Sequence, residues 1–227
     1  YCVNDALRNV YSESGKYHRR KAPEKAICDM FYLKNKYDIE MFYILDETFM
    51  AVAKSEIKTL AEMYKQKINI PFFAQTRPET VTEEKAKIVA DMGCKVMSMG
   101  IENGNDHIRK AVLNRKVSKE QIISGFKILK KYGIQTSSFN MLGVPEETVD
   151  TILETIELNK LCEPDSIGVT YFFPYKGTAL REFALKKNMI TGDEDPNLSH
   201  DVPVLKLPTI SQSEIVHYFV NFVELCR

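Results

Sequence analysis

Five short apolar runs, each followed by a polar or glycine-containing cluster, constrain most strongly what this chain can fold into. Segments of helical length separate the runs, so we predict repeated βα units, a parallel sheet and an α/β fold. In such folds the carboxyl ends of the strands carry the chemistry. The runs and their clusters are 41–45 with Asp46-Glu47-Thr48, 70–74 with Gln75-Thr76-Arg77, 95–99 with Gly100-Ile101-Glu102, 134–139 with Asn140-Met141-Leu142-Gly143, and 166–173 with Pro174-Tyr175-Lys176-Gly177-Thr178.

The number of runs and the chain length together favour a partial barrel. A complete eightfold βα barrel needs roughly 250 residues, whereas this chain has 227. Residues 188–208 are rich in Asp, Pro, Ser and Asn, and residues 213–225 have the apolar spacing of an amphipathic helix. We therefore predict a barrel over residues 1–187, followed by a loop and a C-terminal helix over residues 188–227.

Composition excludes several classes of protein. The formal net charge is zero, so there is no electrostatic signal for nucleic acid or for a membrane surface. No apolar stretch approaches the roughly 20 residues of a membrane helix, and no signal peptide is recognisable. Five widely spaced cysteines do not suggest a disulfide framework. We expect a cytoplasmic protein.

Helix-capping signals define several of the intervening helices. Pro23 suits the first position of a helix. Thr82 can cap a helix that Gly93 would end in a left-handed conformation. Ser118 and Gln121 have the spacing of a capping box.

Two carboxylates, Asp46 and Glu47, follow the first run. Carboxylates in this place can hold an ammonium group or a metal ion, or act in acid–base chemistry. The simpler alternative is that Asp46 caps the next helix and interacts with its dipole. The sequence around these two residues leaves both interpretations open.

Glu102 and Arg115 are the next candidates. Glycines on both sides of Glu102 allow a ligand to approach the backbone closely, and a carboxylate suits a ribose diol. Arg115 could return across the intervening segment to bind a carboxylate. The alternatives are an exposed glycine-rich turn and a surface arginine.

An aromatic pair, Phe172 and Phe173, precedes Pro174. Either ring could stack on a flat base, although filling of the core is the favoured interpretation for either ring taken alone. The segment from Gly143 to Thr148, which follows Asn140, could simply form the turn between a strand and a helix.

The order of these motifs resembles the radical S-adenosylmethionine (radical SAM) superfamily, and within it the branch whose members often carry a cobalamin-binding domain. The resemblance covers residues 1 to about 180. Tyr1-Cys2-Val3-Asn4 resembles the tail of the family's CxxxCxxC motif, which makes Cys2 the third ligand of a [4Fe–4S] cluster. The implied fold is a partial (β/α)6 TIM-like barrel whose first strand is missing from this chain.

The resemblance assigns roles to the clusters at the ends of the runs. Asp46-Glu47-Thr48 occupies the place of the segment that holds the SAM amino group, and Arg115 that of an arginine that binds the SAM carboxylate. Glu102 and Asn140 would contact the ribose or hold the nucleoside, and the strand with Phe172 and Phe173 would flank the adenine. The implied cofactor-binding residues are Asp46, Glu47, Thr48, Gln75, Glu102, Arg115, Asn140, Phe172 and Phe173.

The chain also departs from the family pattern. Glu146 replaces the glycine that is usual in GxPGET, and Lys176 replaces the proline that is usual in PYPGT. Only one of the three cluster cysteines is present, since Cys28, Cys94, Cys162 and Cys226 lack the required spacing. We therefore predict that this chain alone neither holds a stable cluster nor cleaves SAM.

The function implied by the resemblance is reductive cleavage of SAM to a 5′-deoxyadenosyl radical. The resemblance is also consistent with cobalamin-dependent methyl transfer, in which a separate upstream domain would bind the cobalamin. The expected partners are a reductant such as flavodoxin or ferredoxin and a small-molecule or peptide substrate. Two alternatives stay open: a cluster-free α/β barrel lyase or hydrolase with Asp46, Glu47 and Glu102 as metal ligands, and a non-catalytic nucleoside-binding relative.

Overall fold

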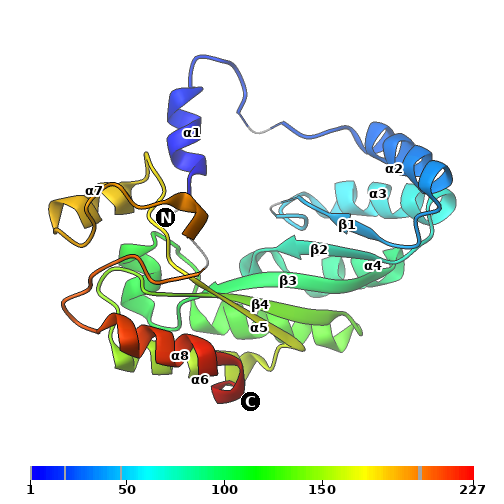
Figure 1. The fold of residues 1–227 in the computed structure, drawn as a ribbon. Helices are drawn as coiled ribbons and strands as arrows, with labels where there is room; N and C mark the ends of the chain where they lie inside the picture. The colour runs from blue at the N-terminus through cyan, green and yellow to red at the C-terminus, as the bar shows by residue number, and fades with distance from the viewer. Residues whose placement is uncertain (1, 18, 47, 199–200) are drawn as a thin grey trace.

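A five-stranded, entirely parallel sheet forms the centre of the molecule (Figure 1). The computed structural model describes residues 2–17, 19–46, 48–198 and 201–227. The strand order follows the sequence, β1-β2-β3-β4-β5, as repeated βα units require. The strands are β1 (Phe42–Ile44), β2 (Phe72–Thr76), β3 (Cys94–Glu102), β4 (Gln135–Leu142) and β5 (Ser166–Tyr171).

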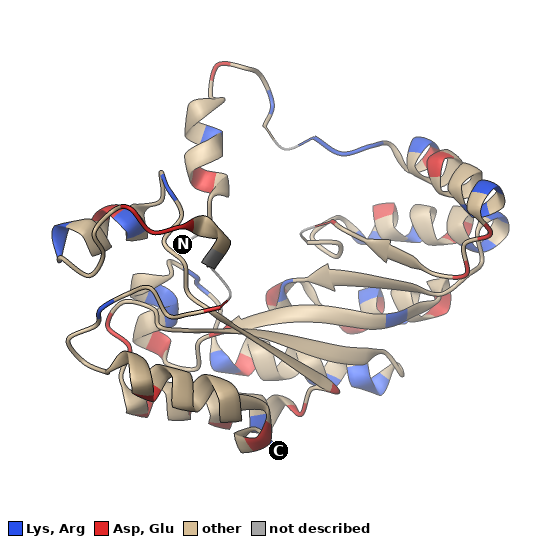
Figure 2. Ribbon diagram, viewed as in Figure 1, with Lys and Arg blue, Asp and Glu red and all other residues tan. Residues whose placement is uncertain are grey.

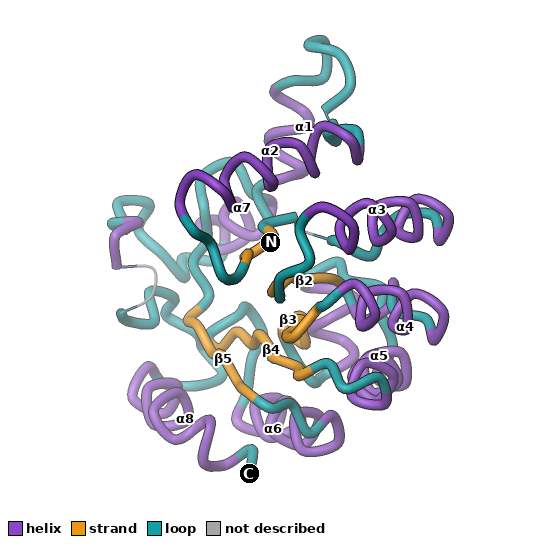
Figure 3. Tube along the Cα trace, turned by 90° about the vertical axis from the view of Figure 1, so that its right-hand side faces the viewer, coloured by secondary structure: helices purple, strands orange, loops and turns teal. Residues whose placement is uncertain are grey.

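Helices cover one side of this sheet and leave its concave side to the cavity described below. Helices α3 to α6 lie outside the curve of the strands, with α8 beside α6, while α1 and α7 lie near the carboxyl ends of the strands (Figures 1 and 3). This arrangement is the predicted α/β fold, a partial TIM-like barrel. The helices are α1 (Asn4–Val10), α2 (Pro23–Tyr37), α3 (Lys54–Lys67), α4 (Glu83–Met92), α5 (Lys119–Lys131), α6 (Val149–Cys162), α7 (Ala179–Lys186) and α8 (Gln212–Leu225).

The predicted caps are confirmed. Pro23 begins α2, and the Thr82 hydroxyl accepts a hydrogen bond from the backbone of Lys85. Gly93 ends α4 with a φ of 110°. Ser118 and Gln121 form both bonds of the capping box. No helix among the described ranges has the length and apolar character needed to span a bilayer.

All five strands end one to three residues from the predicted ends, and the ends of β4 and β5 change the place of candidate site residues. β4 does not stop at Phe139 but continues to Leu142, because residues 140–142 still pair with residues 169–171 of β5. β5 ends at Tyr171, so Phe172 and Phe173 lie beyond the strand. The first difference matters for function, because it places Asn140 inside a strand rather than after one.

The side chains of β3 point alternately into the hydrophobic core and into the cavity. Met97, Met99 and Ile101 are completely buried and belong to the main hydrophobic core. Ser98 and Gly100, between them, line the cavity on the other face. Successive side chains of a strand point to opposite faces, so one strand supplies both surfaces.

The C-terminal segment packs against the last two strands. Ile215 and Phe222 of α8 are buried in a cluster with Leu142 and Tyr171. The Tyr171 ring also stacks on Phe219, with ring centroids 3.9 Å apart. Helix α8 thus covers the outer face of β4 and β5.

Candidate functional site

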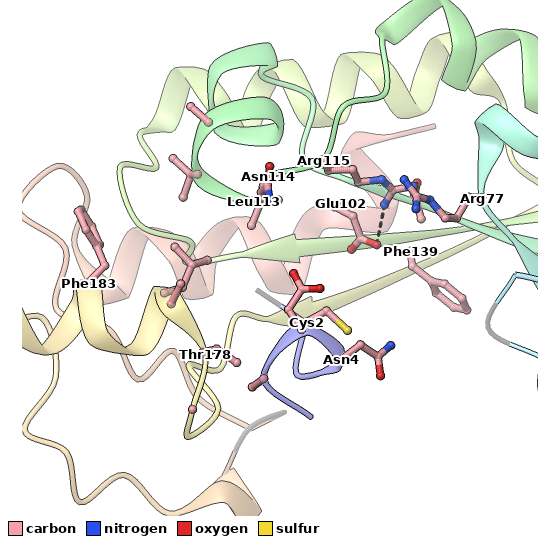
Figure 4. A pocket seen from close by; sticks show the side chains of 18 of the residues that line it. Cys2, Asn4, Arg77, Glu102, Leu113, Asn114, Arg115, Phe139, Thr178 and Phe183 are labelled. Carbon is pink, nitrogen blue, oxygen red and sulfur yellow. Dashed lines mark hydrogen bonds and ion pairs between the residues drawn. The ribbon is translucent and has the colours of Figure 1, made fainter. Parts of the chain in front are cut away.

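One cavity of about 1000 Å³ lies at the carboxyl ends of the strands. Its wall is formed by the start of the chain, the ends of β2 and β3, the segment 107–115 and the start of α7. Figure 4 shows side chains from these separate elements pointing into it. Five predicted residues line it: Cys2, Thr48, Gln75, Glu102 and Arg115.

Glu102 reaches the cavity through an irregularity at the end of β3. The register against β4 shifts between Gly100 and Glu102, which leaves Ile101 buried and pairs Glu102 with Asn140. Glu102 itself has a φ of 66°, in the left-handed region. Non-glycine residues in that region are uncommon and often belong to functional sites. The shift turns the carboxylate toward the cavity side of the strand.

Arg115 faces Glu102 across the cavity wall. Its Nη1 donates to Glu102 Oε1 at 2.9 Å, and its Nη2 donates to the Gly100 carbonyl at 2.7 Å. The residue is only 6% exposed, and its Nε is buried without a hydrogen-bond partner among the described residues. Gly100 makes this packing possible, because a Cβ there would lie 2.2 Å from Glu102 Oε1 and 2.8 Å from Arg115 Nη1.

Cys2 lies just before α1 and lines the same cavity, below Glu102 in the view of Figure 4. It is an exposed free thiol. Ala6 of α1 packs near Gly177, where an added Cβ would be 3.6 Å from the Ala6 Cβ. This contact joins α1 to the turn before α7.

The other cysteines lie elsewhere. Cys28 is on α2, and Cys94, Cys162 and Cys226 are buried free thiols. Burial raises the pKa of Cys94 and of Cys162 to about 12, and that of Cys226 to about 11. Neutral buried thiols are poor metal ligands.

The segment after β1 is anchored on β2. The Phe49 amide donates to the Gln75 carbonyl at 3.0 Å, and the Met50 amide donates to the Thr76 hydroxyl at 3.2 Å. Thr48 of this segment lines the cavity. Glu47 lies outside the described residues.

Asp46 does not line the cavity. Its carboxylate accepts from the Thr48 amide at 3.0 Å and pairs with Arg20 at 3.2 Å. Arg20 belongs to the basic coil that connects α1 to α2 (Figure 2). The alternative role of Asp46 as a helix cap is wrong, because α3 begins only at Lys54, with Ala53 as its N-cap.

Asn140 points away from the cavity. Because β4 continues past it, its side chain falls on the face that packs against α6 and is 1% exposed. Its amide donates to the Gly168 carbonyl at 3.0 Å and accepts from Asn159 at 2.8 Å. Its neighbour Phe139 faces the cavity instead.

The aromatic pair is also outside the cavity wall. Phe172 is 3% exposed and packs in a cluster with Ile108, Leu113 and Leu180. Phe173 is buried, with its ring 5.1 Å from that of Tyr175. Phe172 therefore fills the hydrophobic core, which is the alternative that the sequence left open.

Several cavity residues were missed from the sequence. Ser98 and Phe139 could have been found from strand alternation, since they share a face with Gly100. No sequence signal pointed to the pair at the rim, where His107 Nε2 lies 2.8 Å from Glu146 Oε2. The missed lining residues with polar or aromatic side chains include Ser98, His107, Asn114, Phe139 and Glu146, whereas Thr76, Arg77 and Thr178 belong to the predicted strand-end clusters but had no assigned role.

A carboxylate metal centre has no support in the described part of the chain. Within residues 2–17, 19–46, 48–198 and 201–227, no three His, Cys, Asp or Glu side chains come together as metal ligands. Asp46 is engaged with Arg20, and Glu102 with Arg115.

Comparison with known proteins identifies the family. The model of the radical SAM superfamily matches residues 1–158. This chain belongs to the radical SAM superfamily. The match contains Cys2, Glu102 and Arg115, the three residues that converge on the cavity.

Two curated relatives show the range of the family. An uncharacterized methyltransferase of Pyrococcus horikoshii, PH0819, is 27% identical over 201 residues, which cover 88% of this chain and 44% of that protein. A tRNA-2-methylthio-N(6)-dimethylallyladenosine synthase of Sulfurihydrogenibium is 27% identical over 120 residues, covering 51% of this chain and 27% of that protein. The chain spans less than half the length of either relative.

Solved structures show the same fold. The radical SAM methyltransferase TsrM of Kitasatospora setae, with cobalamin and a [4Fe–4S] cluster bound, matches with a TM-score of 0.65 and 16% identity, over 87% of this chain and 40% of that chain. The cobalamin-dependent radical SAM enzyme OxsB, with aqua-cobalamin bound, matches with a TM-score of 0.66 and 13% identity, over 90% and 38%. Radical SAM proteins of the cobalamin-associated branch are therefore among its structural neighbours.

Proposed function

We propose that this chain forms the SAM-binding part of a radical SAM catalytic core, where SAM and a [4Fe–4S] cluster meet in the cavity. The observation that carries the proposal is the convergence of Cys2, Glu102 and Arg115, from three separate elements, on one cavity. A thiol, a carboxylate and a guanidinium in one site match the chemistry of a cluster iron, a ribose diol and an amino-acid carboxylate.

The described residues fit SAM. A cavity of about 1000 Å³ is at the upper end of the range for small-molecule sites. The unpartnered Nε of Arg115 supports a carboxylate ligand there, since a buried donor without a partner is costly. Glu102 offers acceptors for ribose hydroxyls, and Thr48, which lines the cavity, is proposed with Glu47 for the amino group.

The described residues supply only part of a cluster site. A [4Fe–4S] cluster with one open iron takes three thiolates, and Cys2 is the cysteine that the structure places at the cavity. The buried thiols of Cys94, Cys162 and Cys226 do not fit, since burial raises their pKa. Cys2 is thus proposed as one ligand, with further thiolates required from other residues.

When bound and reduced, such a cluster would supply the one electron that breaks the C5′–S bond of SAM, which gives methionine and a 5′-deoxyadenosyl radical. The task of this chain is to position SAM. Arg115 would hold the carboxylate and Glu102 the ribose, and the apolar helix-facing side of β3 would keep Glu102 on a rigid strand. Gly100 would keep the cavity floor free of a side chain that would displace them.

For the reaction that follows radical formation, we favour cobalamin-dependent methyl transfer. The names of PH0819 and of TsrM support this choice. Cobalamin would be bound by a separate domain, and the electron would come from a reductant such as flavodoxin or ferredoxin, in the cytoplasm. The substrate would be a small molecule or a peptide.

The test is anaerobic iron–sulfur reconstitution of the full-length native protein, followed by quantification of 5′-deoxyadenosine. We expect about four irons per chain and formation of 5′-deoxyadenosine that depends on a reductant. A protein that takes up no cluster and leaves SAM intact would contradict the proposal. Stabilisation by a divalent ion in that same protein would favour the metal-dependent lyase or hydrolase.

A further inference from the structure

Arg109 is a completely buried arginine that no cavity contact explains. It is 0% exposed and is absent from the cavity wall, although Ala111 to Arg115 line that wall. A guanidinium keeps its charge at every physiological pH. Burying it carries a large desolvation cost unless its donors are paired. The contacts of the Arg109 side chain must therefore compensate for this desolvation cost.

Its donors bind backbone carbonyls at two distant points of one segment. Nη1 donates to the carbonyls of Asn103 at 2.9 Å and Gly104 at 3.2 Å. Nε donates to the carbonyl of Val117 at 2.9 Å. Nη2 binds the carboxylate of Asp106. One planar side chain thus joins residues 103–104 to residue 117.

These two points flank the proposed SAM-binding pair. Asn103 directly follows Glu102, and Val117 lies just beyond Arg115. The backbone makes the same connection, because the Arg115 amide donates to the Arg109 carbonyl at 2.8 Å. The segment contains the π-helical turn η2 (Ile108–Val112), a geometry that often occurs at functional sites.

A second set of buried contacts holds the first end of the segment. The Asn103 side chain donates to Glu147 Oε1 at 2.8 Å, and the Gly104 amide donates to the Thr155 hydroxyl at 2.8 Å. A Cβ on Gly104 would lie 2.2 Å from the Glu154 carbonyl, so α6 packs directly on this backbone. Residues 103–104 are therefore a fixed point, and Arg109 ties the other end to it.

We propose that Arg109 is a positioning residue for SAM binding, which closes the segment 103–117 so that Glu102 and Arg115 meet. The role as SAM site rests on the proposed function, whereas the tethering of the segment rests on the contacts alone. Arg109 touches no ligand in this account. It acts through the backbone of Asn103, Gly104 and Val117, which flank Glu102 and Arg115.

The experiment compares the reconstituted full-length protein with its Arg109→Lys and Arg109→Met variants. Hydrogen exchange measures the backbone amides of residues 103–117, and equilibrium dialysis measures the SAM dissociation constant. Lysine keeps the charge but cannot bridge three carbonyls with a planar fork. We expect faster exchange confined to residues 103–117 and a dissociation constant raised about tenfold to a hundredfold in both variants.

The matched control is Ile57→Ala in α3, a buried residue remote from the segment. It should lower the thermal stability while leaving the SAM dissociation constant unchanged. Arg109 variants that lose stability like this control but bind SAM as the wild type does would overturn the positioning role. Wild-type protein that binds no SAM would instead overturn the proposed function, while the exchange data still report on the tether.

If the Arg109 variants do not fold, Asp106→Ala takes their place. Its side chain is half exposed and pairs with Arg109 Nη2. Weaker SAM binding with faster exchange in residues 103–117 would support the inference, and unchanged values of both would contradict it.

Discussion

Arg115 Nη1 lies 2.9 Å from Glu102 Oε1, although the two residues are thirteen positions apart in the chain. Both side chains of the pair line the cavity. A ligand carboxylate that reaches Arg115 would share a guanidinium that already holds Glu102. Binding of SAM should therefore depend on both residues.

Arg115→Ala should weaken SAM binding most. Hydrogen bonds to charged groups contribute about 1.5–3 kcal/mol, so the dissociation constant should rise by about tenfold to a hundredfold. Equilibrium dialysis with labelled SAM measures it. Lys131→Ala is the control, because it removes an exposed pair with Glu83 remote from the cavity. Equal affinities of wild type and Arg115→Ala would remove Arg115 from the site.

Gly100→Ala should abolish the Glu102–Arg115 geometry. The new Cβ would lie 2.2 Å from Glu102 Oε1 and 2.8 Å from Arg115 Nη1, so both side chains must move. We expect a loss of SAM binding of about tenfold or more. Gly168→Ala is the matched control on β5, where a Cβ would meet Phe139 Cδ1 at 3.4 Å. Similar affinities in the two variants would contradict the prediction.

Phe172→Ala should act on stability. Phe172 is 3% exposed within a hydrophobic cluster, so its truncation should cost about 3–5 kcal/mol of unfolding free energy. Phe139→Ala, on the cavity face and 40% exposed, should cost about 1 kcal/mol or less. Urea denaturation of both variants measures this difference. A small effect of Phe172→Ala would return that ring to the list of candidate adenine contacts.

Glu147 should make the stability pH-dependent. Its side chain is completely buried, and desolvation raises its pKa from the ordinary 4.5 to about 8, against hydrogen bonds from Gly143, Val144 and Asn103. Between these values the folded state keeps a proton that the unfolded state has lost. The unfolding free energy should therefore fall as the pH rises through this window, by up to about 1.4 kcal/mol per pH unit.

Glu147→Gln should remove this contribution, because an amide does not titrate. Urea denaturation from pH 5 to pH 8.5 should show the variant losing less stability than the wild type as the pH rises. Glu157→Gln, exposed on the same helix α6, is the matched control. Parallel profiles for the wild type and Glu147→Gln would show that Glu147 is ionised in the folded protein.

The local signals of the sequence predicted the scaffold well. Thr82 and Gly93 bound α4 as expected, because caps depend on one or two side chains and on backbone φ. The parallel sheet followed from the repeated alternation of apolar runs and helices. The short helices α1 and α7 were not predicted; α7 has only eight residues, too few for a clear helical periodicity.

The site was harder to predict, because the direction of a side chain depends on strand register. The sequence predicts Asn140 after the end of a strand, but residues 140–142 of β4 still pair with β5, and the Asn140 amide lies against α6. Glu102 reaches the cavity only because the register shifts at Ile101. No sequence pattern pointed to Arg109 as a site residue, because its proposed role depends on carbonyl groups that become neighbours only after folding.

The most direct test of the central claim is SAM cleavage by full-length native protein with the single change Cys2→Ala. After anaerobic reconstitution and addition of a reductant, 5′-deoxyadenosine is quantified for the wild type, for Cys2→Ala and for Cys28→Ala, a control on α2 away from the cavity. The account predicts 5′-deoxyadenosine from the wild type and from Cys28→Ala, and none from Cys2→Ala. Equal amounts from Cys2→Ala and the wild type would show that Cys2 binds no cluster iron and would contradict the account.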